Sequence, residues 1–187
     1  MTTSRPILDL LRPWLATQRW YPGAPDAEVT RVGGLRLTDP AGQADLQLHL
    51  LSVTHDDGPI TVSIPVTVRS APLEGGDSAL IGRTSPGEDE TNEVWVYDGT
   101  HDAAFVAAWL EMMRRGLSTA DGRCRGQAHA GFQDWARFEP AGMRSRVLAG
   151  EQSNTSVVVD GPDGTVIVKF FRVVAAGQNP DGRSDWH

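Results

Sequence analysis

Two runs of alternating apolar and polar residues, joined by a tight turn, constrain the fold most. Every second residue is apolar from Leu46 to Leu50, and again from Ile60 to Val68. A period of two is typical of a β-strand with one buried face. Asp57-Gly58 between the runs supplies the turn of a hairpin. The region therefore predicts an antiparallel β-hairpin, with Pro65 placing the second strand at a sheet edge or at a bulge.

Further strands are predicted on both sides of this hairpin. Residues 32–37 form one, in which Val32, Leu35 and Leu37 fit a strand with a bulge at Gly33-Gly34. Residues 80–82 and 94–97 form two short apolar strands separated by a polar, acidic segment. The N-terminal half of the chain is therefore expected to be rich in antiparallel sheet.

Apolar residues at helical spacing predict two helices. The first covers residues 7–15, with Ser4 as its N-cap and Pro13 as the residue that kinks or ends it. The second begins after Asp102, whose carboxylate can accept from free backbone N–H groups, and stops at Gly116. Both helices are expected to pack on the strands.

Composition excludes several classes of function. A formal net charge of -7 over 187 residues argues against general binding to nucleic acid or to an anionic membrane. Cys124 is the only cysteine, so an intrachain disulfide is excluded, and the scattered histidines indicate no metal site. The N-terminal segment is broken by charges and by Pro13, which is not typical of a signal peptide, so a cytoplasmic location is expected.

The only lysine of the chain, Lys169, stands in an apolar strand behind a polar loop. One strand enters the loop of small residues at 150–155, a second leaves it, and a turn at 161–164 leads into the third strand with the lysine. Backbone N–H groups of such a loop can surround phosphates, and a lysine brings one positive charge to them. The pattern alone leaves open an ordinary structural hairpin.

Residues 146–181 resemble the nucleotide-binding lobe of actinobacterial maltokinases and related aminosugar kinases, which are similar in fold to aminoglycoside phosphotransferases. The resemblance rests on GEQSNTS, VIVKFFR and GQNPD in the same order and spacing. At residues 14–23, WLATQRWYPG resembles the start of the cap domain that precedes this lobe. The resemblance implies phosphorylation of a sugar by ATP with Mg²⁺, and in the best-known branch maltose gives maltose 1-phosphate.

The resemblance also implies the residues of the site. Lys169 would hold the ATP phosphates, and the phosphate loop would consist of Gln152, Ser153, Asn154 and Thr155. No residue is assigned as catalytic or as a metal ligand, because the large lobe with its catalytic aspartate and magnesium ligands does not follow Asp181. We therefore expect weak nucleotide binding and no turnover by this chain alone, and the question of enzyme activity stays open.

The predicted fold class is α+β in two parts. A mostly antiparallel, cystatin-like cap domain with one or two packed helices spans 1–116, a linker spans 117–131, and an incomplete, hairpin-rich kinase-like small lobe spans 132–187. Apolar surface on an incomplete lobe predicts self-association or contact with a missing large lobe.

Two other functions remain open. One is a free-standing, non-catalytic binding or regulatory module that docks on an enzyme of glycogen or trehalose metabolism. The other is a purely structural β-rich domain, which would require Lys169 to be buried against a carboxylate.

Overall fold

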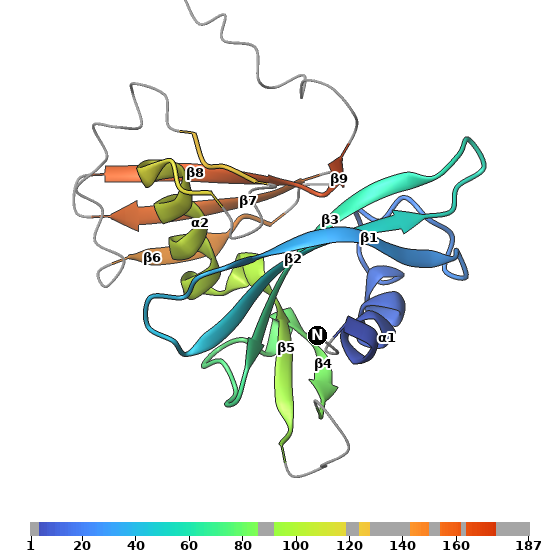
Figure 1. Ribbon diagram of the computed structural model, residues 1–187, viewed down its shortest axis with the longest axis horizontal. Coiled ribbons are helices and arrows are strands. Elements are labelled where there is room, and N and C mark those ends of the chain that lie inside the picture. The colour runs from blue at the N-terminus through green and yellow to red at the C-terminus, as the bar shows by residue number, and fades with distance from the viewer. Residues whose placement is uncertain are drawn as a thin grey trace, which may run out of the picture.

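The computed structural model describes residues 4–85, 92–118, 124–127, 143–149, 154–161 and 164–174. These residues form two antiparallel β-sheets and two α-helices (Figure 1). The predicted class, α+β with mostly antiparallel sheet and packed helices, is confirmed. The finer assignments, a cystatin-like part and a kinase-like part, stay predictions.

The larger sheet is built around the predicted hairpin. Its strand order is β1-β2-β3-β5-β4, and the short β9 pairs with β3. The hairpin strands β2 and β3 are paired without interruption from Ala44 opposite Arg69 to Val53 opposite Ile60. The strands predicted at 80–82 and 94–97 are β4 and β5. The bounds are β1 (Val29–Leu37), β2 (Ala44–Val53), β3 (Ile60–Arg69), β4 (Leu80–Thr84), β5 (Val94–Asp98) and β9 (Val173–Val174).

Pro65 does not mark an edge strand, so that prediction is wrong. β3 lies inside the sheet, with β2 on one side and both β5 and β9 on the other. β5 pairs with residues 66–69 and β9 with 61–62. The N–H of Ser63 points to this second side, where it donates to the carbonyl of Arg172 at 2.8 Å. Pro65, two residues on, points the same way, into the interval between the two partner strands, where no N–H is needed.

The hairpin also has two buried faces rather than the one that its alternation predicts. In β2, Leu46 and Leu48 belong to one core, whereas Leu51 and Val53 belong to the other. The reason is that a helix packs on each face of the sheet. Alternation in the sequence marked only one of these faces.

The bulge in β1 lies one residue before its predicted place. The pairing with β2 shifts between Arg31 and Gly33, which leaves Val32 as the extra residue. As the extra residue of the bulge, Val32 is 57% exposed. Gly34 has φ 151°, and a Cβ there would lie 2.4 Å from the carbonyl oxygen of Leu48. A side chain therefore does not fit at Gly34.

The first helix, α1 (Ser4–Leu15), covers one face of the larger sheet. Its apolar side packs on β2, β3 and β5, with Pro13 inside the last turn and the helix end at Leu15. The buried contacts are Ile7, Leu11, Leu15, Leu51, Val53, Val62, Ile64, Val66 and Val96. Neither described helix is long and apolar enough to cross a membrane.

The second helix, α2 (Ala103–Arg115), lies between the two sheets (Figure 1). The smaller sheet has the order β6-β7-β8, with β6 (Arg144–Val147), β7 (Asn154–Gly161) and β8 (Gly164–Phe171). Phe170 of β8 lies against Phe105 and Trp109 of α2, with ring centroids 6.1 Å and 5.8 Å apart. Burial of each such ring contributes about 2 kcal/mol. The division of the chain at 1–116, 117–131 and 132–187 stays a prediction, and one core runs across it.

The predicted ends of α2 are confirmed. The carboxylate of Asp102 accepts from the N–H of Ala104 at 2.9 Å. The same carboxylate accepts two bonds from Arg69 of β3, at 2.7 Å and 2.9 Å. Gly116 adopts the left-handed conformation at φ 60°, which closes the helix. The start of α2 is therefore fixed to the larger sheet by a buried ion pair.

We predict that Asp102→Ala lowers the free energy of unfolding by about 3 kcal/mol, because it removes a helix cap and leaves the half-buried Arg69 without its carboxylate. Urea denaturation followed by circular dichroism measures the loss. Asp77→Ala, which removes an exposed carboxylate, is the control and should stay within about 0.5 kcal/mol of the wild type. Equal losses in the two variants would contradict the assignment.

His49 is a buried base in β2. It is 2% exposed, and its Nε2 lies 2.9 Å from Oε1 of Gln47. Burial, together with the charges of Arg31 and Arg36, lowers the pKa of His49 from 6.5 to about 4. The folded protein therefore holds His49 neutral at pH values where the unfolded chain protonates it.

Because the pKa of His49 is lower in the folded state, stability present above pH 6.5 is lost as the pH falls toward 4. We predict a loss of about 2 to 3 kcal/mol between pH 7 and pH 4.5 that His49→Gln abolishes. Urea denaturation at several pH values measures it, with His55→Gln in the β2–β3 turn as control. Identical pH profiles for the wild type and both variants would refute this role of His49.

Candidate functional site

Lys169 lies near the end of β8, and its side chain is exposed. Its neighbours Val168 and Phe170 are buried in the core with α2. Because alternate residues of a strand point to opposite faces, Lys169 lies on the face of the smaller sheet that is turned away from α2. Lys169 is therefore not buried, and burial against a carboxylate was the observation that would have indicated a purely structural domain.

Two arginines of β6 share this face with Lys169. Arg144 pairs with Asp160 of β7, and Arg146 pairs with Val158. Val158 lies two residues from Ser156, which is the partner of Lys169. Residues directly opposite each other share a face of a sheet, so all three cations lie on one side. We call Arg144, Arg146 and Lys169 the basic face.

The basic face carries net positive charge in an acidic protein. All three basic side chains are exposed, and the described carboxylate among their cross-strand partners is Asp160, which accepts from Thr165 at 2.6 Å. Three positive charges and one negative charge give this face +2, against -7 for the whole chain. Such a surface attracts a polyanion such as a chain of phosphates.

The predicted phosphate-loop residues are divided between the two faces. Asn154 begins β7 opposite Phe171 and has the same parity as Ser156, so it lies on the side of the basic face. Thr155 is buried and lies on the opposite side, where its hydroxyl accepts from Nε of Arg172 at 2.8 Å. Gln152 and Ser153 lie outside the described residues. Phosphate binding by these residues stays a prediction.

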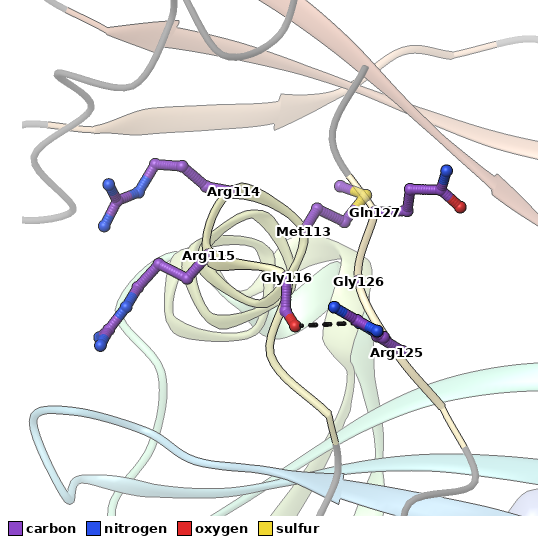
Figure 2. Close-up of a pocket in the computed structure, with 7 residues that line it drawn as sticks. All are labelled: Met113, Arg114, Arg115, Gly116, Arg125, Gly126 and Gln127. Atoms are coloured by element: carbon purple, nitrogen blue, oxygen red, sulfur yellow. Dashed lines mark hydrogen bonds between the residues drawn. The ribbon is translucent and has the colours of Figure 1, made fainter. Parts of the chain in front are cut away.

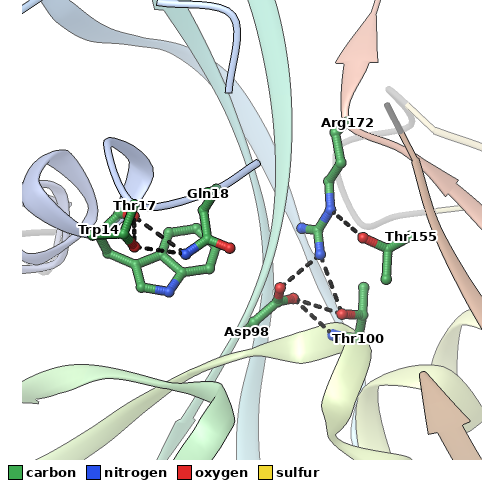
Figure 3. A network of polar contacts seen from close by, with 7 residues as sticks. All are labelled: Trp14, Thr17, Gln18, Asp98, Thr100, Thr155 and Arg172. Atoms are coloured by element: carbon green, nitrogen blue, oxygen red, sulfur yellow. Dashed lines mark hydrogen bonds and ion pairs between the residues drawn. The ribbon is translucent and has the colours of Figure 1, made fainter. Parts of the chain in front are cut away.

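Arg172 follows β8 and is buried where the two sheets meet, with 1% of its side chain exposed. Its Nη2 donates to Oδ2 of Asp98 at 2.6 Å and to Oγ1 of Thr100 at 3.2 Å (Figure 3). Its guanidinium carbon lies 4.9 Å from the ring centroid of Trp20. With the bond to Thr155, these contacts join the larger sheet to the start of β7. We call Arg172, Asp98, Thr100 and Thr155 the arginine junction.

The charge of Arg172 is neutralised inside the protein. The side chain of Asp98 is 7% exposed, and its Oδ1 also accepts from the N–H and the hydroxyl of Thr100, at 3.1 Å and 2.8 Å. A buried ion pair is stable only when further hydrogen bonds accompany it, and the two threonines supply them. A pocket of about 160 Å³ adjoins the junction, bordered by Gln18 and Trp20 on one side and by Asn154 and Thr155 on the other.

Arg144, Arg146, Asp98 and Arg172 are not among the functional residues predicted from the sequence. The spacing of Arg144 and Arg146 at i and i+2 in a strand is a signal for a shared face. Arg172 directly follows an apolar strand, and a charge in such a place needs a buried partner. No sequence pattern identifies Asp98 as that partner, because 74 residues separate them.

A second polar pocket, of about 520 Å³, lies at the C-terminal end of α2 (Figure 2). Its arginines are already bonded within the protein. Arg114 donates to Glu111 at 2.7 Å and 2.8 Å, and Nε of Arg125 donates to the carbonyl of Gly116 at 3.4 Å. We place the candidate site on the basic face, because Asn154 of the predicted phosphate loop lies on the same side of the smaller sheet.

Fold and site together define an α+β protein in which a helix-covered antiparallel sheet supports a smaller sheet with a basic face. Residues 14–102 match the family model described as the maltokinase N-terminal cap domain. The match begins in α1, covers β1 to β5 and ends at Asp102, the N-cap residue of α2. The chain therefore contains a maltokinase N-terminal cap domain, as the resemblance of residues 14–23 indicates. The strands β6 to β8 lie outside the match.

We predict that Asp98→Asn destabilises the protein by about 3 to 5 kcal/mol, because it leaves the buried charge of Arg172 without a counter-ion. Asp160→Asn removes a carboxylate that is exposed and should change stability by less than about 0.5 kcal/mol. Chemical denaturation of the two variants at pH 7 makes the comparison. An Asp98→Asn protein as stable as the wild type would show that the ion pair contributes nothing to folding.

Proposed function

We propose that this chain supplies the cap domain and the phosphate-binding hairpin of a maltokinase-like, ATP-dependent sugar kinase. The observation that carries the proposal is the exposed Lys169 on the basic face, in β8, the second strand after the small-residue loop. The match of residues 14–102 supports the maltokinase relationship. Maltose as the sugar and maltose 1-phosphate as the product rest on the resemblance alone. A cytoplasmic location rests on the N-terminal segment, which is not typical of a signal peptide.

The positive charges of the basic face suit a nucleoside triphosphate as ligand. A lysine presents a compact charge, and arginines present planar forks that match phosphate oxygens. ATP, when bound, supplies the phosphoryl group, and the part assigned to Arg144, Arg146 and Lys169 is to hold and orient its phosphates. Among the described residues, no group of three or more metal-ligating side chains comes together, so we assign none of them to magnesium.

A second observation favours contact with another protein surface. Ile167, on the side of the basic face, is 65% exposed, and Val173 and Val174 of β9 are 40% and 42% exposed. Exposed apolar residues of this size beside a binding face are typical of a surface that another domain covers. We propose a kinase large lobe as the covering surface. A second copy of the chain and an enzyme of glycogen or trehalose metabolism, in a non-catalytic docking module, are the alternatives.

Titration calorimetry with ATP tests the proposed function. We expect wild-type protein to bind ATP weakly and Lys169→Ala to bind it at least tenfold more weakly, a difference of about 1.4 kcal/mol. Arg146→Ala should weaken binding in the same direction. Arg83→Ala, which removes an exposed arginine from β4, is the control and should bind like the wild type.

Two further ligands identify the part of ATP that is recognised. Tripolyphosphate should compete with ATP, and adenosine should not, because the basic face binds charge. Binding should weaken as salt is added. Failure of the wild type to bind either ATP or tripolyphosphate, or equal affinity in Lys169→Ala, would overturn the proposal and leave the docking module as the better one.

A further inference from the structure

We propose that Arg172 is a positioning residue that couples the cap domain to the phosphate loop. It holds the first residues of β7, Asn154 and Thr155, against the cap domain, so that the cap domain sets the position of this described end of the phosphate loop. The role of the loop in this statement rests on the proposed function. The coupling itself rests on the contacts of Arg172, Asp98 and Thr155.

Arg172 is attached to the cap domain through both its side chain and its backbone. Its guanidinium bonds to Asp98 at the end of β5 and to Thr100 in the 3-10 turn Gly99–His101. Its carbonyl accepts from the N–H of Ser63 in β3 at 2.8 Å. Arg172 therefore has little freedom relative to the larger sheet.

The other contact of Arg172 reaches the base of the phosphate loop. Thr155 is the second residue of β7, and its hydroxyl accepts from Nε of Arg172. The N–H of Leu148 donates to the carbonyl of Ser156 at 2.8 Å, which closes the loop between these two residues. Lys169 stands three residues before Arg172 and pairs with Ser156. One arginine is thus fixed to the cap domain, to the loop base and to the lysine strand.

The bond to Thr155 can be removed without disturbing the ion pair. Asp98 neutralises Arg172 through Nη2, whereas Thr155 is bonded to Nε. Valine has nearly the same shape as threonine but lacks the hydroxyl that accepts from Nε. Since Asp98 is bonded to Nη2, the charge of Arg172 stays paired in Thr155→Val. Removal of Arg172 itself leaves a buried carboxylate, and that variant risks unfolding. Thr155→Val is therefore the decisive variant.

Hydrogen exchange of the full chain, read by mass spectrometry, tests the coupling. We expect peptides that cover 148–156 to exchange at least fivefold faster in Thr155→Val, with the exchange of the β2–β3 peptides unchanged. Thr155→Ser should restore the wild-type rate. Thr165→Val is the matched control, because it removes a threonine hydroxyl bonded to Asp160 on the same hairpin. Unchanged exchange at 148–156, or faster exchange throughout the protein, would overturn the inference.

A double variant shows whether the effect passes through Arg172. Arg172→Lys keeps a charge for Asp98 but cannot also span the distance to Thr155, so it should give the same faster exchange. Combined with Thr155→Val it should add nothing further, because the two changes break one bond. Additive rates in the double variant would contradict coupling through Arg172.

ATP affinity separates this inference from the proposed function. Thr155→Val should bind ATP three- to tenfold more weakly, and Thr165→Val should bind it like the wild type. If wild-type protein binds no ATP, the proposed function fails, and the exchange rates alone decide the coupling. If wild-type protein binds ATP and Thr155→Val changes neither affinity nor exchange, the coupling fails and the proposed function stands.

Discussion

The packing of β8 on α2 decides which side of the smaller sheet meets solvent. Phe170 and Val168 are buried against Phe105 and Trp109, in the core that also takes Leu46 and Leu48 from β2. Since β8 alternates, the burial of these two residues turns Lys169 outward. The exposed lysine is thus a consequence of apolar packing across the two sheets and not of any contact that lysine makes.

The arginine junction is the polar counterpart of this apolar contact. Apolar packing is non-directional and tolerates small displacements, whereas the bonds of Arg172 to Asp98 and Thr155 have fixed geometry. The two contacts lie at different places along β8, with α2 under the strand and Arg172 after its end. Together they leave the smaller sheet one orientation relative to the cap domain.

Local patterns predicted most of the elements. Alternation of apolar and polar residues predicted β2 and β3, and Asp102 and Gly116 predicted the two ends of α2. These signals are reliable because they lie within a few residues of the structure that they specify. Pro65 and the bulge of β1 were misplaced, because strand order and the position of a bulge depend on partners far along the chain. For the same reason the sequence identified Lys169 as a candidate but not Arg144 and Arg146, which reach its face only through the pairing of β6 with β7.

The two kinds of cation near the loop have different physical roles. The charge of Arg172 is compensated by Asp98 in a site closed to water, so it contributes little to the field that an approaching anion meets. The charges of the basic face are exposed and lie on the side of the smaller sheet that is turned away from α2. We therefore expect Arg144, Arg146 and Lys169 to attract the phosphates. Arg172 would act on the ligand only through the position of the backbone that it holds.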